Sequence, residues 1–244
     1  MAKIAILGYG KMGKEIEKIL LQYGHIIIII DNEDDWTNHY SQFCECDVAI
    51  EFSTPQSVIN NLYRCFDANV PIVCGTTGWN NETQAVIDYC KQKSGSLVYG
   101  SNFCIGANLF FKMNELLAQM MNQQPEYDVT IEETHHVTKK DAPSGTAITT
   151  ANLIINQLDR KTNWKLNDNS QSDTIHVLAH RLGEEPGTHV VRYTSENDCI
   201  EITHKIYQRS ALASGAVKAA MWLINHHGVY QFKDIFMELN AFAK

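Results

Sequence analysis

The feature that most constrains this chain is a glycine-rich turn between a short apolar run and a helical pattern. Residues 3–7 (Lys-Ile-Ala-Ile-Leu) lead into residues 8–13 (Gly-Tyr-Gly-Lys-Met-Gly), and apolar residues at helical spacing follow directly. A second apolar run, residues 25–30, ends at Asp31. This order predicts a strand, a tight turn, a helix and a second strand, which together form the βαβ unit of dinucleotide-binding proteins.

The three glycines of this turn have separate predicted tasks. Gly8 would make the tight turn, Gly10 would let a pyrophosphate approach the backbone, and Gly13 would let the helix pack against the sheet. A glycine turn in an α/β protein that binds no nucleotide is the alternative, because the motif by itself is short. Its place between a strand and a helix favours nucleotide binding.

Asp31 bears on which nucleotide is bound. An acidic residue at the end of the second strand would hold a ribose 2′-OH and repel a 2′-phosphate. Residues 32–35 (Asn-Glu-Asp-Asp) supply no basic side chain to counter that repulsion. We therefore expect NADH to be favoured, although Lys11 in the glycine loop could reach a phosphate and leaves NADPH open.

Further strands alternate with helices as far as residue 121. Strands are predicted within 46–55, over 70–74 and over 97–99, and helices over 57–69, 80–93 and 109–121. Open parallel sheets bind ligands at the carboxyl ends of their strands, so the nicotinamide is expected beside the loops that follow these strands. The candidate residues in those loops are Phe52, Ser53, Gly75, Thr76, Thr77, Ser101, Asn102 and Phe103.

Two of these loops have further interpretations. Thr76 and Thr77 are equally suited to cap the helix over 80–93. The loop 100–108 is rich in small residues and could bring backbone carbonyls to the nicotinamide carboxamide. The alternation of strand and helix stops after residue 121, which indicates that a second domain begins in this region.

Residues 131–147 (Ile-Glu-Glu-Thr-His-His-Val-Thr-Lys-Lys-Asp-Ala-Pro-Ser-Gly-Thr-Ala) concentrate polar chemistry in the second half. The upstream residues 127–134 alternate with β-branched side chains and predict a strand that ends near two histidines. Pro143 stops regular structure, and Ser144 is placed to cap a helix over 147–158. The amides of Ser144, Gly145 and Thr146 would then form a cradle for a carboxylate or phosphate.

The loop that leads into this cradle carries candidate catalytic residues. His135, His136 and Lys139 would add charge-assisted hydrogen bonds to the same anion, and a histidine is a natural proton donor near neutral pH. A surface loop with a helix cap is the alternative. We expect no metal, because adjacent histidines point to different sides of an extended chain and the nearby lysines would repel a cation.

The remaining sequence predicts an α+β arrangement with a mixed or antiparallel sheet. A polar connection over 159–173 is followed by strands over 174–179, 187–193 and 199–207, and by helices over 211–225 and 234–242 that could return to the first domain. We predict a dinucleotide-binding domain over 1–106 and 210–244, and a substrate-binding and oligomerisation domain over 107–209. Self-association would cover an open sheet face or edge.

Composition limits the possible partners. With 20 Lys and Arg against 28 Asp and Glu, the net charge of −8 argues against a nucleic acid or an anionic membrane surface as partner. Seven cysteines without paired metal spacing, and no secretory signal pattern, indicate reduced thiols in a cytoplasmic protein.

Residues 133–147 resemble the signature of the 4-hydroxy-tetrahydrodipicolinate reductase (dihydrodipicolinate reductase) family. Further blocks similar to that family follow its order along essentially the whole chain. They are residues 8–13, Gly75-Thr-Thr-Gly78, Ser101-Asn-Phe103, Ile200-Glu-Ile-Thr-His-Lys205 and Ser214-Gly-Ala216. The resemblance implies reduction of a cyclic dicarboxylate imine in lysine and diaminopimelate biosynthesis, with NADH, NADPH or both, by a homotetramer built through the second domain's sheet.

The resemblance also implies roles for single residues. His135 matches the proton donor, Lys139 a residue of substrate binding and catalysis, and His136 a contact to the substrate carboxylate. Ser144, Gly145 and Thr146 match the other carboxylate contacts. The cofactor positions match Gly8, Lys11, Met12, Gly13, Asp31, Gly75, Thr76, Thr77, Ser101, Asn102 and Phe103, and we include Tyr9 and Gly10 of the same loop among the predicted cofactor contacts. The family often carries arginine where this chain has Lys11, which adds to the expectation of NADH.

Two other functions stay open at this point. A different two-domain dehydrogenase, of the amino-acid or aldehyde type, would need another base or a nucleophilic cysteine, and Cys104 lies near the predicted nicotinamide loop. A regulatory module would bind NAD(H) tightly without turning it over.

Overall fold

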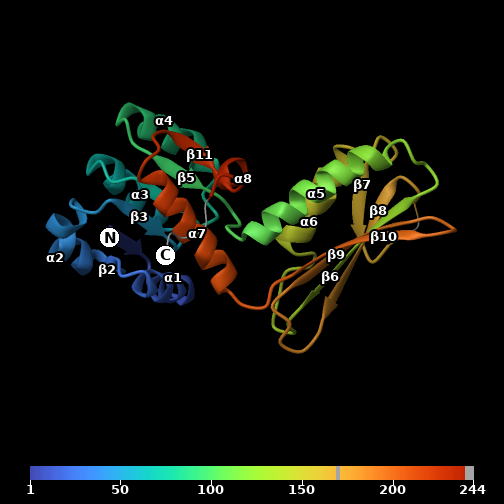
Figure 1. Cartoon of the computed structure of the whole chain (residues 1–244), viewed down its shortest axis with the longest axis horizontal. Helices are drawn as coiled ribbons and strands as arrows, with labels where there is room; N and C mark the ends of the chain where they lie inside the picture. The colour runs from blue at the N-terminus through green and yellow to red at the C-terminus, as the bar shows by residue number, and fades with distance from the viewer. Residues whose placement is uncertain (169–170, 240–244) are drawn as a thin grey trace. The chain divides into compact units, whose positions relative to one another are not determined.

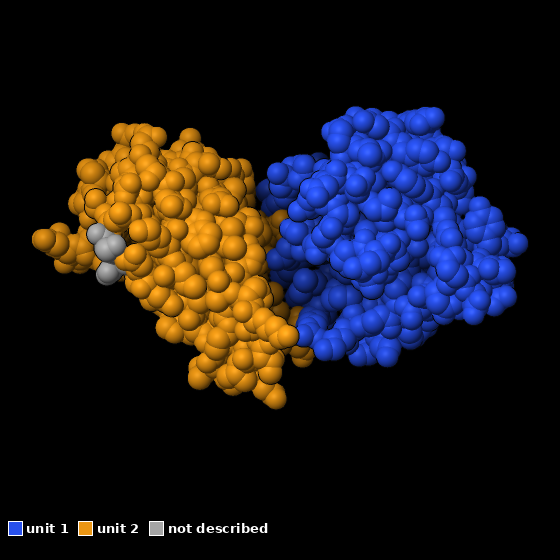
Figure 2. Space-filling view, turned by 180° about the vertical axis from the view of Figure 1, so that it is seen from behind, with its two compact units in different colours: residues 1–105, 209–244 blue, residues 106–208 orange. Residues whose placement is uncertain are grey.

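The computed structural model describes residues 1–168 and 171–239 (Figure 1). Their contacts form two compact units, coloured separately in Figure 2. Unit 1 consists of residues 1–105 and 209–244 as far as they are described, and unit 2 of residues 106–208. It stays a prediction that the first domain binds the nucleotide. It also stays a prediction that the second domain binds the substrate and self-associates.

Unit 1 is built on a six-stranded parallel sheet in the order β11-β5-β4-β3-β1-β2. Its elements are β1 (Lys3–Leu7), α1 (Lys11–Gln22), β2 (Ile26–Ile30), α2 (Glu33–Phe43), β3 (Val48–Glu51), α3 (Val58–Asp67), β4 (Ile72–Cys74), η1 (Asn80–Glu82), α4 (Thr83–Gln92), β5 (Leu97–Tyr99), α7 (Ser210–Leu223), β11 (Val229–Gln231) and α8 (Phe232–Ile235). The strands are short and apolar because helices cover both faces of the sheet. The predicted Rossmann-like fold is confirmed.

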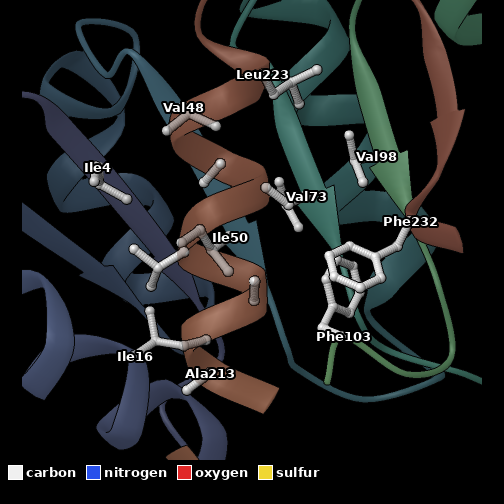
Figure 3. Packing of buried hydrophobic residues seen from close by; sticks show 14 of the residues in the cluster. Ile4, Ile16, Val48, Ile50, Val73, Val98, Phe103, Ala213, Leu223 and Phe232 are labelled. Atoms are coloured by element: carbon white, nitrogen blue, oxygen red, sulfur yellow. The ribbon is translucent and has the colours of Figure 1, made fainter. Parts of the chain in front are cut away.

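Successive residues of each strand face opposite cores. In β1, Ile4 and Ile6 belong to one buried cluster, whereas Ala5 and Leu7 belong to the other. Helices α1 and α7 supply the first cluster, and Figure 3 shows α7 lying beside side chains of the strands with Leu223 near one end and Ala213 near the other. Helices α2, α3 and α4 supply the second cluster.

Parts of unit 1 differ from the predicted elements. Helix α2 was not predicted, because its sequence is mostly polar and buries only Trp36 and Phe43 among its residues. The helix predicted over 234–242 is largely wrong: α8 ends at Ile235, residues 236–239 are not helical, and residues 240–242 lie outside the described chain. The strand β11, which pairs with β5, was not predicted. The edge of the parallel sheet offers β11 hydrogen bonds that the local sequence does not reveal.

Unit 2 holds a five-stranded mixed sheet in the order β10-β9-β6-β8-β7. Its elements are α5 (Ile105–Met121, whose first residue is the last of unit 1), β6 (Asp128–His135), α6 (Gly145–Ile155), β7 (Asn163–Leu166), β8 (Thr174–Arg181), β9 (Thr188–Thr194) and β10 (Cys199–Lys205). The central strand β6 runs parallel to β8 and antiparallel to β9. A mixed or antiparallel sheet was predicted, and the sheet is mixed.

Helices α5 and α6 cover one face of this sheet (Figure 1). The buried pattern alternates along β6, so Val129 and Ile131 join Ala147 and Ile154 of α6 in one core. Two expectations were wrong here. The predicted polar connection over 159–173 contains the strand β7, and the predicted loop over 100–108 gives way at residue 105 to α5.

No helix in the described ranges is long and apolar enough to cross a membrane.

Gly215 provides a test of the packing in unit 1. A Cβ atom at this position of α7 would lie 1.7 Å from the carbonyl oxygen of Phe103. In Gly215→Ala the backbone must move apart, which we expect to cost about 1–3 kcal/mol. The roughly 1 kcal/mol that alanine gains over glycine in a helix offsets part of that cost. We therefore expect a net fall in the free energy of unfolding. Urea denaturation measures the change. Ser214→Ala in the same helix is the control, and equal stability of the two variants would contradict this account.

Candidate functional site

The glycine loop of unit 1 places one open backbone position at the start of α1. Gly8 has φ +90°, and a Cβ there would lie 2.5 Å from the carbonyl oxygen of Phe52. A Cβ on Gly13 would lie 2.3 Å from the carbonyl oxygen of Gly8, whereas one on Gly10, the N-cap residue of α1, would meet nothing within 4 Å. Gly8 and Gly13 are therefore required by the loop itself, and Gly10 leaves space for an anion at the helix N-terminus.

Asp31 fastens the end of β2 to this loop. Its carboxylate accepts a hydrogen bond of 2.6 Å from the backbone N–H of Tyr9. The first turn of α2 adds the acidic residues Glu33, Asp34 and Asp35. The guanidinium of Arg64 is already paired with Glu33 through two hydrogen bonds, of 3.0 and 2.7 Å. The surroundings of Asp31 are therefore acidic.

The ends of β3 and β4 meet beside this loop. The backbone N–H of Ser53 donates to the Thr76 hydroxyl at 2.8 Å, and a Cβ on Gly75 would overlap the ring of Phe52 at 2.1 Å. The structure thus brings together Phe52, Ser53, Gly75 and Thr76, as the predicted nicotinamide site requires. The capping alternative for Thr76 and Thr77 is wrong, because Trp79 and Glu82 are the N-cap residues of η1 and α4.

The third predicted loop lies at the end of β5. Phe103 is buried, with its ring 5.8 Å from that of Phe52 and 4.5 Å from that of Phe232. Its side chain therefore belongs to the core, and only its backbone is free to serve a cofactor. Asn102 accepts a hydrogen bond from the backbone N–H of Cys104 at 2.9 Å, and Ser101 is exposed.

Glu51, the last residue of β3, was not predicted as a site residue. This carboxylate is fully buried and accepts hydrogen bonds from the hydroxyl of Ser53 and, at 3.4 Å, from the amide of Asn61. A charged residue at the end of an apolar strand was the available signal. Glu51 holds the loop that carries Phe52 and Ser53.

In unit 2 a second buried carboxylate, Glu133, organises the end of β6. Oε1 of Glu133 accepts from the backbone N–H of Ser144 at 3.0 Å and from Nη2 of Arg181 at 3.3 Å. Oε2 lies 3.2 Å from Nδ1 of His135 and 3.7 Å from Nε2 of His189. One carboxylate thus joins the predicted proton donor to the predicted anion cradle.

Electrostatics favour the charged form of this carboxylate. Burial by itself raises the pKa of the Glu133 carboxyl, but the neighbouring imidazoles of His135 and His189 and the hydrogen bond from Ser144 outweigh it and hold the pKa well below its ordinary value. Burial also lowers the pKa of His189, which favours its neutral form. The positive charge of Arg181 balances Glu133.

The anion cradle differs in one respect from the predicted set of three amides. Ser144 is the N-cap residue of α6, and its hydroxyl accepts from the backbone N–H of Ala147 at 3.2 Å, as predicted. The N–H of Ser144 itself is taken by Glu133. The N–H groups of Gly145 and Thr146 lie in the first turn of the helix, where no intrahelical partner exists, and can face an anion.

The predicted cationic residues lie in the loop between β6 and α6. His136 is partly exposed, with its ring Nδ1 2.7 Å from the hydroxyl of Thr138. Nζ of Lys139 is paired with both carboxylate oxygens of Asp141, at 2.8 and 2.7 Å. A substrate carboxylate bound by Lys139 would therefore compete with Asp141.

Three members of this cluster, Glu133, Arg181 and His189, were not assigned from the sequence. The alternation along β6 could have placed Glu133 on the same face as His135. His189 and Arg181 come from other strands: Glu133 is in register with His189 of β9, and His135 with Arg181 of β8. No local pattern marks such partners.

The same cluster has the composition of a metal site. Glu133, His135 and His189 each offer a ligand atom within 4.8 Å of the others. A cation there would face the guanidinium of Arg181 and would compete with the contact between the Ser144 hydroxyl and Nε2 of His189, which is 2.9 Å long. We interpret the cluster as a hydrogen-bond network, and the expectation of no metal stays a prediction.

Acid unfolding tests the charge of Glu133. Because its pKa is lowered in the folded state, the carboxylate stabilises the fold above about pH 4.5, and this contribution is lost as the pH falls. We expect the free energy of unfolding to fall more steeply between about pH 5 and pH 3 in the wild-type protein than in Glu133→Gln. Urea denaturation at each pH measures it, and parallel curves would contradict the assignment.

Comparison with known proteins covers nearly the whole chain. Residues 2–103 match the family model described as dihydrodipicolinate reductase, N-terminus, and residues 106–236 match the model described as dihydrodipicolinate reductase, C-terminus. A 4-hydroxy-tetrahydrodipicolinate reductase of Christiangramia forsetii is 43% identical over 236 residues, which are 97% of this chain and 98% of that protein.

Two more distant comparisons agree with these matches. The 4-hydroxy-tetrahydrodipicolinate reductase of Neisseria meningitidis serogroup B is 33% identical over 198 residues, covering 78% of this chain and 72% of that protein. The structure of a dipicolinate-bound dihydrodipicolinate reductase from Paenisporosarcina sp. TG-14 superposes with a TM-score of 0.78 at 23% identity, covering 96% of this chain and 99% of that one. At that identity the superposition supports the fold alone.

Proposed function

The chain belongs to the dihydrodipicolinate reductase family, and from this membership we propose how its residues perform the family's reaction. The protein is an NAD(P)H-dependent oxidoreductase of lysine and diaminopimelate biosynthesis. It reduces (2S,4S)-4-hydroxy-2,3,4,5-tetrahydrodipicolinate to tetrahydrodipicolinate. Family membership decides against the two alternatives, a different two-domain dehydrogenase and a module without turnover.

One observation supports this mechanism above all: Glu133 contacts both His135 and the backbone N–H of Ser144 at the N-terminus of α6. The N–H groups of Gly145 and Thr146, with His136 and Lys139, bind a carboxylate of the substrate. His135 acts as the general acid, and Lys139 neutralises negative charge beside it. A histidine so close to an anion-binding helix start is placed to protonate the substrate that the helix holds.

The loop 8–13 holds the nucleotide in unit 1. The pyrophosphate lies at the N-terminus of α1 against Gly10, and the ribose lies at Asp31. Phe52, Ser53, Gly75, Thr76 and the backbone of the loop at 101–103 hold the nicotinamide, which when bound supplies a hydride. The open space at Gly10 supports this placement.

NADH is the preferred cofactor in this proposal. A 2′-phosphate on the ribose would face Asp31 and the acidic first turn of α2, while the nearby Arg64 is engaged by Glu33. Lys11, at the start of α1, could still neutralise a phosphate, so some use of NADPH is compatible with the same site.

The active form in this proposal is a homotetramer that associates through the sheet of unit 2. Helices α5 and α6 cover one face of that sheet, and the residues of the edge strand β10 are exposed or only partly buried. Association would cover this surface and the unpaired edge. A mass of one or two chains in sedimentation equilibrium would reject the tetramer.

Replacement of His135 tests the general acid. We expect His135→Gln to lower kcat by about 10²- to 10⁴-fold, because that is the usual contribution of a positioned acid, with little change in NADH binding. The substrate is generated from pyruvate and aspartate semialdehyde by the preceding synthase, and NADH consumption is followed. Near-normal turnover would refute the role of His135. Lack of turnover by the wild-type protein would instead reject the proposed reaction.

Replacement of Asp31 tests the cofactor preference. We expect kcat/KM to be higher with NADH than with NADPH for the wild-type protein, and Asp31→Ser to reduce that ratio, because serine removes the charge that repels a 2′-phosphate. Asp88→Ser in α4 serves as the control for a lost surface carboxylate. A ratio that Asp31→Ser leaves unchanged would place the determinant elsewhere.

A further inference from the structure

We propose that Glu133 is a positioning residue that fixes the tautomer of the His135 ring, with a proton on Nδ1, so that Nε2 is the atom that delivers the proton to the substrate. The inference rests on the proposed role of His135 as general acid. It assigns a task to a carboxylate that does not itself react.

Burial forces the contact between the two residues. Glu133 is fully buried, and His135 is 8% exposed. Oε2 of Glu133 and Nδ1 of His135 are both excluded from solvent, and among the described residues neither atom makes an aligned hydrogen bond, with the other or with a third group. They lie 3.2 Å from each other. Because a buried polar atom without a partner is costly, the stable arrangement is a proton on Nδ1 that faces the carboxylate.

The carboxylate is itself held in place. Oε1 is bound by the backbone N–H of Ser144 and by Arg181, which come from the start of α6 and from β8. Because these two hydrogen bonds hold Oε1, the carboxylate has little freedom to turn Oε2 away from His135. The imidazole is therefore oriented by the same carboxylate that contacts the anion-binding helix.

A glycine lies beside the Nε2 edge of the ring. A Cβ on Gly187, in the connection between β8 and β9, would lie 3.0 Å from Nε2 and 3.3 Å from Cδ2 of His135. Gly187 therefore places no side chain against Nε2, and any larger residue at this position would press on the ring. This supports Nε2 as the atom that serves the substrate.

Several charged or titratable groups, from every neighbouring element, lie in and around the cluster of His135, Glu133 and His189. They are Glu133 on β6, Arg181 on β8, His189 on β9, Lys139 in the loop before α6 and Glu185 in the loop after β8. Glu133 is the carboxylate in direct contact with the His135 ring. Burial lowers the pKa of His189, which favours a neutral ring that adds no positive charge beside His135.

The proton transfer is balanced within this arrangement. Loss of water from the 4-hydroxy substrate gives the conjugated imine. Hydride addition to that imine leaves an enamine, whose ring carbon takes the proton from Nε2 of the imidazolium. The new C–H bond forms with the enamine electron pair, and the electron pair of the broken N–H bond stays on Nε2. The Nδ1 proton remains between the ring and Glu133, which stays ionised throughout.

Nitrogen-15 NMR of the imidazole rings tests the tautomer without substrate or turnover. The chain has ten histidines, so the signals of His135 are identified by their loss in His135→Gln. We expect the neutral ring of His135 in the wild-type protein to carry its proton on Nδ1. In Glu133→Gln, the amide carbonyl keeps the N–H of Ser144 and the NH₂ group faces Nδ1, so the proton should move to Nε2.

Kinetics with the same variants give a second readout. We expect Glu133→Gln to lower kcat about 10²-fold, within the contribution of a positioned acid, while KM for NADH is unchanged. The fall of kcat at high pH should begin at lower pH, because an imidazolium loses its neighbouring negative charge. Glu133→Asp keeps the charge and should restore part of both effects. Glu115→Gln, which removes a carboxylate paired with Lys112 on the surface of α5, should match the wild type.

The outcomes separate this inference from the proposed function. An Nε2–H tautomer in the wild-type protein would overturn it even if Glu133→Gln failed to fold. A folded Glu133→Gln with the wild-type kcat and pH profile would also overturn it. An Nδ1–H tautomer combined with full activity of His135→Gln would instead leave the positioning intact and reject His135 as the acid.

Discussion

A carboxylate that is shut away from water at the end of a strand is the constraint on which the site in unit 2 depends. Glu133 cannot be buried alone, since an unpaired charge in a protein interior is very costly. Its two oxygens therefore collect partners from four segments: His135 of its own strand, Arg181 of β8, His189 of β9 and Ser144 at the start of α6. Meeting the needs of one charge fixes the relative positions of a proton donor and an anion-binding helix end.

The first unit solves a similar problem with backbone geometry. Gly8 and Gly13 are needed where the loop passes close to Phe52 and to itself, and this close packing leaves Gly10 exposed at the beginning of α1. A buried carboxylate, Glu51, again holds the following loop through Ser53. In both units the sheet supplies rigid strand ends, and the chemistry is carried by the loops that those ends position.

The predictability of individual residues follows from how locally each is specified. The glycine loop, Asp31 and the cap at Ser144 were found because strand, turn and helix signals lie next to one another in the chain. The strand β7, the strand β11 and the helix α2 were missed, because their short or polar sequences form regular structure only when a neighbouring strand or helix offers them hydrogen bonds or a buried surface.

The sequence by itself determined the βαβ unit, with an acidic residue at the end of its second strand, and the α+β arrangement of the second half. It also placed His135, Lys139 and the Ser-Gly-Thr turn in one segment. These are properties of adjacent residues, and periodicity and turn chemistry express them directly. Only the tertiary structure decided that Arg181 and His189 stand beside Glu133, and that the N–H of Ser144 serves this carboxylate. Those contacts depend on the register of β6 with β8 and β9, which is set by burial across the whole sheet and leaves no mark in the local sequence.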